Sequence, residues 1–213
     1  MPIESLIDQG APPIVAILRG VTPDAAVAVG SALVEAGILL IEVPLNSPQP
    51  LESIARLRQA VSSRCLIGAG TVLSPEQVDG VADVGGQFIV SPDTSAAVIV
   101  RSLQLGLDSL PGFFTATEAF AAVAAGARNL KLFPAQSAGA KHFAAIREVL
   151  PRDVKIWAVG GIEAGNLAEW LGRGAAGVGI GGSIFKPEMP LNTVRQRAEA
   201  VIRAWQAAAP SGS

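Results

Sequence analysis

Eight short apolar segments, rich in Val, Ile and Leu, recur along the chain and constrain its fold more than any other feature. Each segment ends in Gly, Pro or a polar residue, and most are apolar at nearly every position. Strands of this kind are typical of a parallel sheet whose two faces are both covered. The segments span residues 14–20, 38–44, 65–71, 87–92, 107–112, 128–134, 154–161 and 175–182.

The stretches between the apolar segments carry the start and stop signals of helices. Thr, Ser or Pro opens these stretches and Gly closes them, as in residues 22–37 and 115–126. Strands that alternate with helices define an α/β protein. Eight such units can form an open doubly wound sheet, but eight is also the number that closes a barrel, so we predict a single (β/α)8 TIM barrel. We expect one domain over residues 1–213, with a helical lead-in over 1–10 and a flexible tail over 210–213.

Composition and charge argue against several classes of protein. Of the 213 residues, 50% are hydrophobic and 16% are charged, which suits a compact core and argues against disorder. A net charge of −2 provides no basic surface for nucleic acid and no polybasic stretch for a membrane. The single cysteine, Cys65, fits a reducing compartment, and the N-terminal residues lack the pattern of a signal peptide. We therefore expect a cytoplasmic protein without nucleic-acid or membrane partners.

Lys131 is an ionisable residue inside an apolar segment, near the carboxyl end where barrels build their active sites. Because side chains alternate along a strand, Leu130 and Leu132 face one way, and Lys131 and Phe133 face the other, into the barrel. Burial disfavours the ammonium form, which is the usual route to a nucleophilic amine near neutral pH. The alternative is a lysine whose stem packs in the core while its charged tip reaches solvent.

Glu42 is the second ionisable residue within an apolar segment, where a lone carboxylate is costly without a partner. One interpretation is a purely structural ion pair with Lys131. The other is a proton shuttle beside a reactive amine, serving both dehydration and carbon–carbon bond cleavage. An ionised Glu42 favours the ammonium form of Lys131 whereas burial disfavours it, so the sequence leaves the net change in the lysine pKa open.

Two glycine pairs follow the last two apolar segments, where barrels of this kind often bind phosphate. Glycine lets the backbone N–H groups approach an anion closely, and a nearby hydroxyl can donate a further hydrogen bond. Tight turns also use glycine routinely, so each pair alone is weak evidence. The predicted phosphate-binding residues are Gly160, Gly161, Gly181, Gly182 and Ser183.

A series of motifs, in order from about residue 12 to 187, resembles the 2-keto-3-deoxy-6-phosphogluconate and 2-keto-3-deoxy-6-phosphogalactonate aldolase family. The resemblance implies a class I (Schiff-base) aldolase, an aldehyde lyase that reversibly forms pyruvate and D-glyceraldehyde 3-phosphate. It also implies that the enzyme needs no metal or organic cofactor and acts as a homotrimer. The motifs are AILRG, IEVPLNSP, IGAGTVL, FIVSPDT, PGFFTATEAF, LKLFPA, AVGGI and GIGGSIF.

The resemblance assigns roles to individual residues. Matched by motif, Lys131 is the Schiff-base lysine and Glu42 is the general acid and base. Among the residues at the pyruvate end, Arg19 and Thr71 are expected near the carboxylate. The full set at that end is Arg19, Thr71, Pro92 and Phe133. The glycine pairs and Ser183 match the phosphate loops.

Two positions depart from the phosphogluconate-type pattern, which has EVTLRT after the second strand and PTGG in the seventh. In the phosphogluconate type these positions place the arginine and the threonine in the substrate pocket. Here Asn46 replaces the arginine and Val159 replaces the threonine as predicted substrate-binding residues, and both match the phosphogalactonate type. We therefore favour the phosphogalactonate substrate over the same reaction on the phosphogluconate epimer.

A non-catalytic phosphosugar-binding barrel would keep the glycine loops but would not need Lys131 and Glu42. A metal-dependent enzyme would need clustered ligands, and the chain has one histidine, His142.

Overall fold

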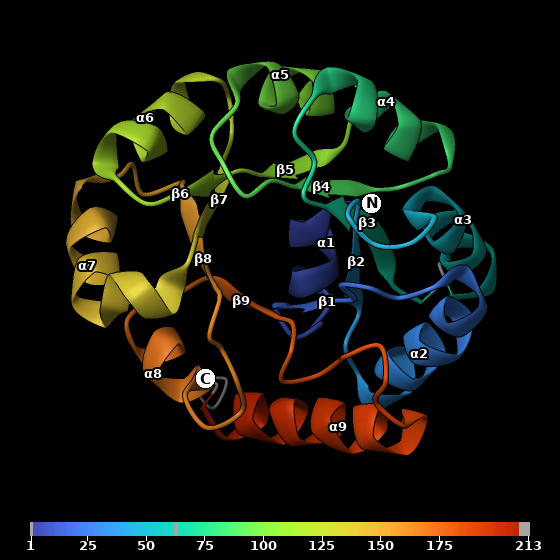
Figure 1. Cartoon of the computed structure of the whole chain (residues 1–213). Coiled ribbons are helices and arrows are strands. Elements are labelled where there is room, and N and C mark those ends of the chain that lie inside the picture. The colour runs from blue at the N-terminus through green and yellow to red at the C-terminus, as the bar shows by residue number, and fades with distance from the viewer. Residues whose placement is uncertain (1, 62–63, 209–213) are drawn as a thin grey trace.

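The protein is a closed ring of parallel strands surrounded by helices (Figure 1). The computed structural model describes residues 2–61 and 64–208, and the predicted tail over 210–213 lies outside them. The strands are β1 (Ile14–Ile17), β2 (Leu40–Pro44), β3 (Leu66–Gly70), β4 (Phe88–Val90), β5 (Asp108–Leu110), β6 (Gly112–Phe113), β7 (Asn129–Leu132), β8 (Lys155–Val159) and β9 (Gly177–Ile180).

The order of strands in the sheet shows how the ring closes. It runs β5-β4-β3-β2-β1-β9-β8-β7-β6, and the paired neighbours are all parallel. The two strands at the ends of this order, β5 and β6, follow one another directly in the chain. The predicted TIM barrel is therefore confirmed.

The fifth predicted strand, residues 107–112, is divided in the structure. Pro111 separates β5 from β6, so the part of the chain that the structure describes contains nine strands at eight positions of the barrel. The carbonyl of Pro111 still accepts a hydrogen bond of 2.8 Å from the Lys131 backbone N–H. Proline has no N–H to donate, so one hydrogen bond of the ladder is missing at this position and the strand is interrupted.

Helices follow the strands and cover the outside of the barrel (Figure 1). Ser74 and Thr115 cap the helices that begin after them, and Thr115 forms a reciprocal capping box with Glu118. No helix within the described residues is long and apolar enough to cross a membrane. The helices are α1 (Ile3–Asp8), α2 (Pro23–Ala36), α3 (Pro50–Val61), α4 (Pro75–Asp83), α5 (Ala96–Gln104), α6 (Ala116–Ala124), α7 (Ala135–Val149), α8 (Leu167–Gly172) and α9 (Leu191–Ala208).

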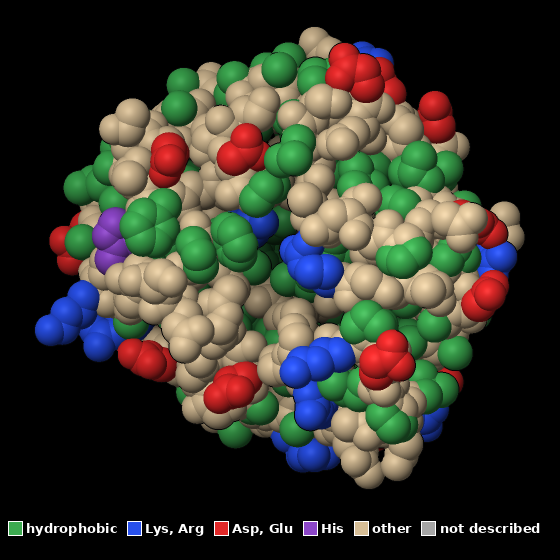
Figure 2. All heavy atoms as spheres, in the orientation of Figure 1, with side chains coloured by type: hydrophobic (Ala, Val, Ile, Leu, Met, Phe, Trp, Pro, Cys, Tyr) green, Lys and Arg blue, Asp and Glu red, His purple; other side chains and the backbone are tan. Residues whose placement is uncertain are grey.

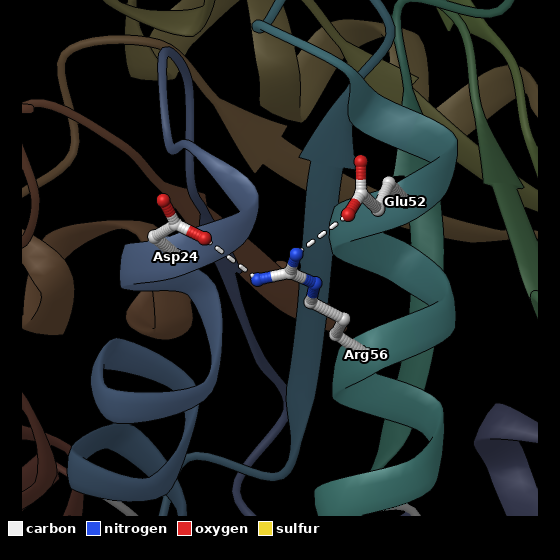
Figure 3. A network of polar contacts seen from close by, with 3 residues as sticks. All are labelled: Asp24, Glu52 and Arg56. Carbon is white, nitrogen blue, oxygen red and sulfur yellow. Dashed lines mark hydrogen bonds and ion pairs between the residues drawn. The ribbon is translucent and has the colours of Figure 1, made fainter.

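A polar network joins the neighbouring helices α2 and α3 on the surface (Figure 3). Arg56 donates hydrogen bonds to Asp24 at 2.8 Å and to Glu52 at 2.6 Å. All three side chains are exposed, so the surrounding water screens their attraction. The network orients two outer helices, whereas buried apolar contacts provide most of their packing energy.

The amino-terminal end of the barrel is closed by α1, which lies within the predicted helical lead-in. Ile3 and Leu6 of α1 are buried and pack against an apolar layer inside the barrel. The backbone N–H of Ile3 also donates a hydrogen bond of 2.6 Å to Asp108 at the start of β5. The strand residues of this layer are Val15, Leu40, Leu66, Phe88, Val90, Leu110 and Trp157. We call this buried apolar layer, at the amino-terminal end of the barrel, the floor of the interior.

Glycines in β3 make room for the larger side chains of neighbouring strands. A Cβ atom on Gly68 would overlap the ring and carbonyl of Phe88, and one on Gly70 would overlap the carboxylate of Glu42. Leu40 and Glu42 are two residues apart on β2 and therefore share its inner face. The interior thus changes along its axis, from apolar side chains at the floor to ionisable side chains nearer the carboxyl ends of the strands.

Candidate active site

Glu42 of β2 and Lys131 of β7 both face the interior of the barrel, as the alternation along the strands predicts. Their side chains line the same small internal cavity, together with apolar residues of the floor. The exposed fraction is 3% for Glu42 and 6% for Lys131, which separates both groups from bulk water. The other residues around this cavity are Val15, Ile17, Val90, Leu110, Trp157, Val159 and Gly179.

Burial dominates the ionisation of both groups. It lowers the pKa of Lys131 to about 8, although the Glu42 carboxylate acts to raise it. Burial also raises the pKa of Glu42 to about 7, although Lys131 and Arg19 both act to lower it. The question that the sequence left open is therefore answered in favour of desolvation. An amine and a carboxyl group with pKa values this near neutrality can exchange protons at physiological pH.

The surroundings of Glu42 and Lys131 differ from those of a structural ion pair. Within residues 2–61 and 64–208, no ion pair joins the two side chains, and the buried Oε2 of Glu42 has no hydrogen-bond partner. Lys131 Nζ instead lies 4.8 Å from the centroid of the Phe133 ring. A buried carboxylate oxygen without a partner is costly, and such exceptions call for an explanation such as a catalytic role.

A larger cavity of about 650 Å³ opens above this pair at the carboxyl ends of the strands. Seen along the barrel axis, the surface is hollowed near its middle, with Lys and Arg side chains in and beside the hollow (Figure 2). Val159 lines both cavities and so connects them. The predicted residues that line the larger cavity are Arg19, Phe133, Val159, Gly160, Gly161, Gly181, Gly182 and Ser183.

The two predicted phosphate loops meet at one side of this cavity. Gly160 and Gly161 have φ angles of +99° and +77°, a backbone region in which residues with a Cβ atom are strained. The hydroxyl of Ser183 donates a hydrogen bond of 3.0 Å to the carbonyl of Ile162, so it ties one loop to the other. Asn166 steadies the first loop by donating to the Gly161 carbonyl at 2.8 Å. These two hydrogen bonds hold the glycine loops together.

Three predicted residues, Thr71, Pro92 and Asn46, line neither cavity. Thr71 and Pro92 follow β3 and β4 at the same end of the barrel. Thr71 has a φ angle of +58°, which is unusual for a β-branched residue. Hydrogen bonds of the flanking residues hold this conformation, 2.8 Å from Leu45 N to Gly70 O and 3.3 Å from Val72 N to Val90 O.

Several residues that line the larger cavity were not predicted from the sequence. Lys186 follows the second glycine loop and is an exposed cation beside Gly182. Gln136, in the first turn of α7, lies against Gly161, where a Cβ atom would overlap its side chain. The signal that could have found them is their position, since Gln136 directly follows the motif LKLFPA and Lys186 directly follows the motif GIGGSIF. The remaining residues in this group are Ile17, Ile162, Glu163, Asn166, Gly179, Phe185 and Pro187.

Metal-binding side chains do not cluster in this region. Across the described ranges 2–61 and 64–208, no group of three or more His, Cys, Asp or Glu side chains is placed to hold a metal ion. The ring of His142 stacks on Phe114 at a centroid distance of 5.5 Å, and its Nε2 lies 2.7 Å from the Phe114 carbonyl oxygen. The absence of a metal from the mechanism stays a prediction.

Comparison with known proteins identifies the family. The model of the KDPG and KHG aldolase family matches residues 3–200. The 2-dehydro-3-deoxy-6-phosphogalactonate aldolase of Escherichia coli (strain K12) is 44% identical over 92% of this chain and 96% of its own length. A probable enzyme of the same name from Rhizobium meliloti (strain 1021) is 48% identical over 92% of each chain. A solved structure described as native KDPGal, 44% identical, superposes with a TM-score of 0.90 over 92% of this chain and 95% of that one.

The chain therefore belongs to the KDPG and KHG aldolase family, as the motif series indicates. It is an aldolase, and the family predicted from the sequence is confirmed.

The coupling between Lys131 and Glu42 can be tested by NMR. The side-chain resonances of Lys131 should titrate with a midpoint near pH 8, because burial lowers its pKa to about 8. Glu42→Gln removes the carboxylate that favours the ammonium form, so the midpoint should move to lower pH. The chain has four lysines, and Lys131→Met identifies the resonance by its loss. A midpoint that stays in place or rises in Glu42→Gln would contradict this coupling.

Proposed function

We propose that the protein is a class I aldolase that reversibly cleaves 2-keto-3-deoxy-6-phosphogalactonate to pyruvate and D-glyceraldehyde 3-phosphate. The observation that carries this proposal is the buried pair of Lys131 and Glu42 at the base of a cavity edged by two glycine loops. A non-catalytic phosphosugar-binding barrel would have no use for two ionisable groups in a dry interior. The names of the relatives support the same substrate.

In this mechanism the neutral amine of Lys131 attacks the C2 carbonyl of the substrate. Glu42 donates a proton to the departing hydroxyl as the carbinolamine loses water and becomes an iminium ion. The Glu42 carboxylate then accepts the proton of the C4 hydroxyl while the C3–C4 bond breaks, and its electron pair moves to the iminium nitrogen. Proton return to C3 of the enamine, followed by hydrolysis, releases pyruvate and frees the amine. The pKa of Glu42, raised to about 7, suits a group that both gives and takes protons.

The two charged ends of the substrate bind to residues of the larger cavity and to Thr71 and Pro92 at the same end of the barrel. Arg19 and Thr71 contact the carboxylate, and Pro92 and Phe133 border the pyruvate moiety. The phosphate lies against the loops that contain Gly160, Gly161, Gly181, Gly182 and Ser183, whose backbone N–H groups suit an anion. Lys186 adds a positive charge at that edge of the cavity. The same cavity accepts the phosphogluconate epimer, which differs only at C4, as a poorer substrate.

The proposed enzyme acts as a homotrimer, as the family resemblance implies, and its composition and single cysteine support a cytoplasmic location. Several large apolar side chains on and next to α5 and α6 are exposed, a feature of subunit interfaces. Neither helix contributes a residue to the two cavities. A trimer that uses this surface would leave the active site open. The exposed residues are Val100, Leu103, Leu105 and Phe120.

Imine trapping tests the nucleophile. Borohydride added with pyruvate should attach one pyruvate-derived group irreversibly, and peptide mapping by mass spectrometry should place it on Lys131. Cleavage activity should also survive a strong chelator, because the mechanism uses no metal. An unlabelled protein, or a label on Lys141, Lys155 or Lys186, would refute the mechanism. Activity that a chelator removes and added metal restores would do the same.

Glu42→Gln tests the proton shuttle. The substitution keeps the shape of the side chain and removes its acid–base function, so kcat should fall by about 10²–10⁴. The exposed residue Glu148 provides the matched control, since Glu148→Gln should leave kcat unchanged. The measurements are pyruvate release and thermal unfolding. A Glu42→Gln enzyme that stays active but is much less stable would show that the carboxylate has only a structural role.

Val159→Thr tests the choice of epimer. We expect the parent to prefer the phosphogalactonate epimer, because Val159 presents an apolar surface near C4. A threonine of almost equal size adds a hydroxyl, and a hydrogen bond to one epimer is worth roughly 1 kcal/mol, or several-fold in the ratio of kcat/KM. Pyruvate release from each pure epimer gives this ratio. Val159→Ala, which adds no hydroxyl, separates hydrogen bonding from size. A parent that prefers the phosphogluconate epimer would overturn the substrate assignment alone.

A further inference from the structure

Asn46 distinguishes the phosphogalactonate-type motif from the phosphogluconate-type motif, yet it lines neither cavity. Its side chain is exposed after β2, and its Oδ1 accepts a hydrogen bond of 2.6 Å from Nη1 of Arg19. Arg19 itself lines the larger cavity. Resting on the function proposed above, we infer that Asn46 is a positioning residue that holds the guanidinium of Arg19 at the cavity and affects the substrate only through it.

The backbone beside Arg19 is already fixed by its neighbours. The N–H of Gly20 donates a hydrogen bond of 2.9 Å to the hydroxyl of the buried Ser47. Gly20 has a φ angle of +82°, and a Cβ atom there would lie 2.8 Å from Cγ of Pro187. The turn is thus enclosed by the loops after β2 and β9. What remains free is the side chain of Arg19, and Asn46, the residue before Ser47, supplies its partner.

The chemistry of an amide suits this task. An exposed arginine has many rotamers, and ordering them at the moment of binding lowers affinity for the substrate. A hydrogen bond that Arg19 already donates to Asn46 before the substrate binds removes part of that cost. Because the Asn46 oxygen is neutral, it orients Arg19 without cancelling its charge, and the guanidinium retains further N–H donors for a carboxylate.

The same contact explains how the position can differ between the two types. An arginine at position 46, as in the phosphogluconate-type pattern, offers no acceptor and brings a like charge toward Arg19. The guanidinium of Arg19 would then have to adopt another orientation. The difference at position 46 therefore reaches the substrate through Arg19, whereas the difference at Val159 acts directly inside the cavity.

A double-mutant cycle tests the inference. Asn46→Leu keeps the approximate size and removes the acceptor, so the pyruvate concentration for half-maximal borohydride trapping should rise about three- to tenfold. The maximal trapping rate should change little, because Lys131 and Glu42 are untouched. In an Arg19→Met background, the same Asn46→Leu substitution should add less than about a twofold change. Arg19→Lys provides a second background if Arg19→Met is labelled too slowly. Asn192→Leu, on the exposed face of α9, is the matched control and should behave as the parent.

The outcomes separate this inference from the proposed function. Non-additive effects confined to the half-saturating pyruvate concentration support a positioning role for Asn46. Additive effects of the Arg19 and Asn46 substitutions would show that Asn46 acts independently, and an unchanged Asn46→Leu protein would show that it does not act at all. Either result overturns the inference and leaves the aldolase mechanism intact. A parent protein that pyruvate and borohydride do not label would refute the proposed function and this inference with it.

Discussion

The desolvation of Lys131 and Glu42 is the physical effect on which the site depends. In water these groups would be fully charged at neutral pH, but inside the barrel burial outweighs their mutual attraction and draws the two pKa values together, to about 8 and about 7. The cost falls on folding, since neither group has a close ionic partner among residues 2–61 and 64–208 to offset its burial. The large apolar core and the closed ring of strands stabilise the fold against this cost.

The interior is arranged in layers along the barrel axis, and each layer has its own function. The floor is apolar and closed by α1, and its side chains are almost fully buried beneath the ionisable pair. The pair occupies the middle, where Gly70 of β3 leaves space for the Glu42 carboxylate. The mouth combines Arg19 with the two glycine loops, where we propose that the charged groups of the substrate bind. Burial in the interior changes the pKa values of Lys131 and Glu42, whereas the mouth is the proposed place of substrate recognition.

Much of this arrangement could be predicted from the sequence, because it follows from the alternation of side chains along single strands. Lys131 and Glu42 face inward for that reason, and the glycine pairs follow their strands. Pro111 could be seen in the sequence, but its effect on the strand could not be predicted. Whether a proline ends a strand or only breaks its pairing depends on the neighbouring strand. The contact between Arg19 and Asn46 joins loops 27 residues apart in the chain. Such contacts depend on loop geometry, which local patterns do not encode.

The left-handed backbone of Thr71 has a consequence for engineering this enzyme. A β-branched residue at this φ angle is strained by about 1–3 kcal/mol, and the surrounding hydrogen bonds keep it there. Glycine would relax the backbone but would remove the hydroxyl proposed to meet the carboxylate. Selection for thermostability alone would therefore drift toward glycine at position 71 and away from substrate affinity. A library built on this barrel should hold that position fixed, or screen stability and turnover together.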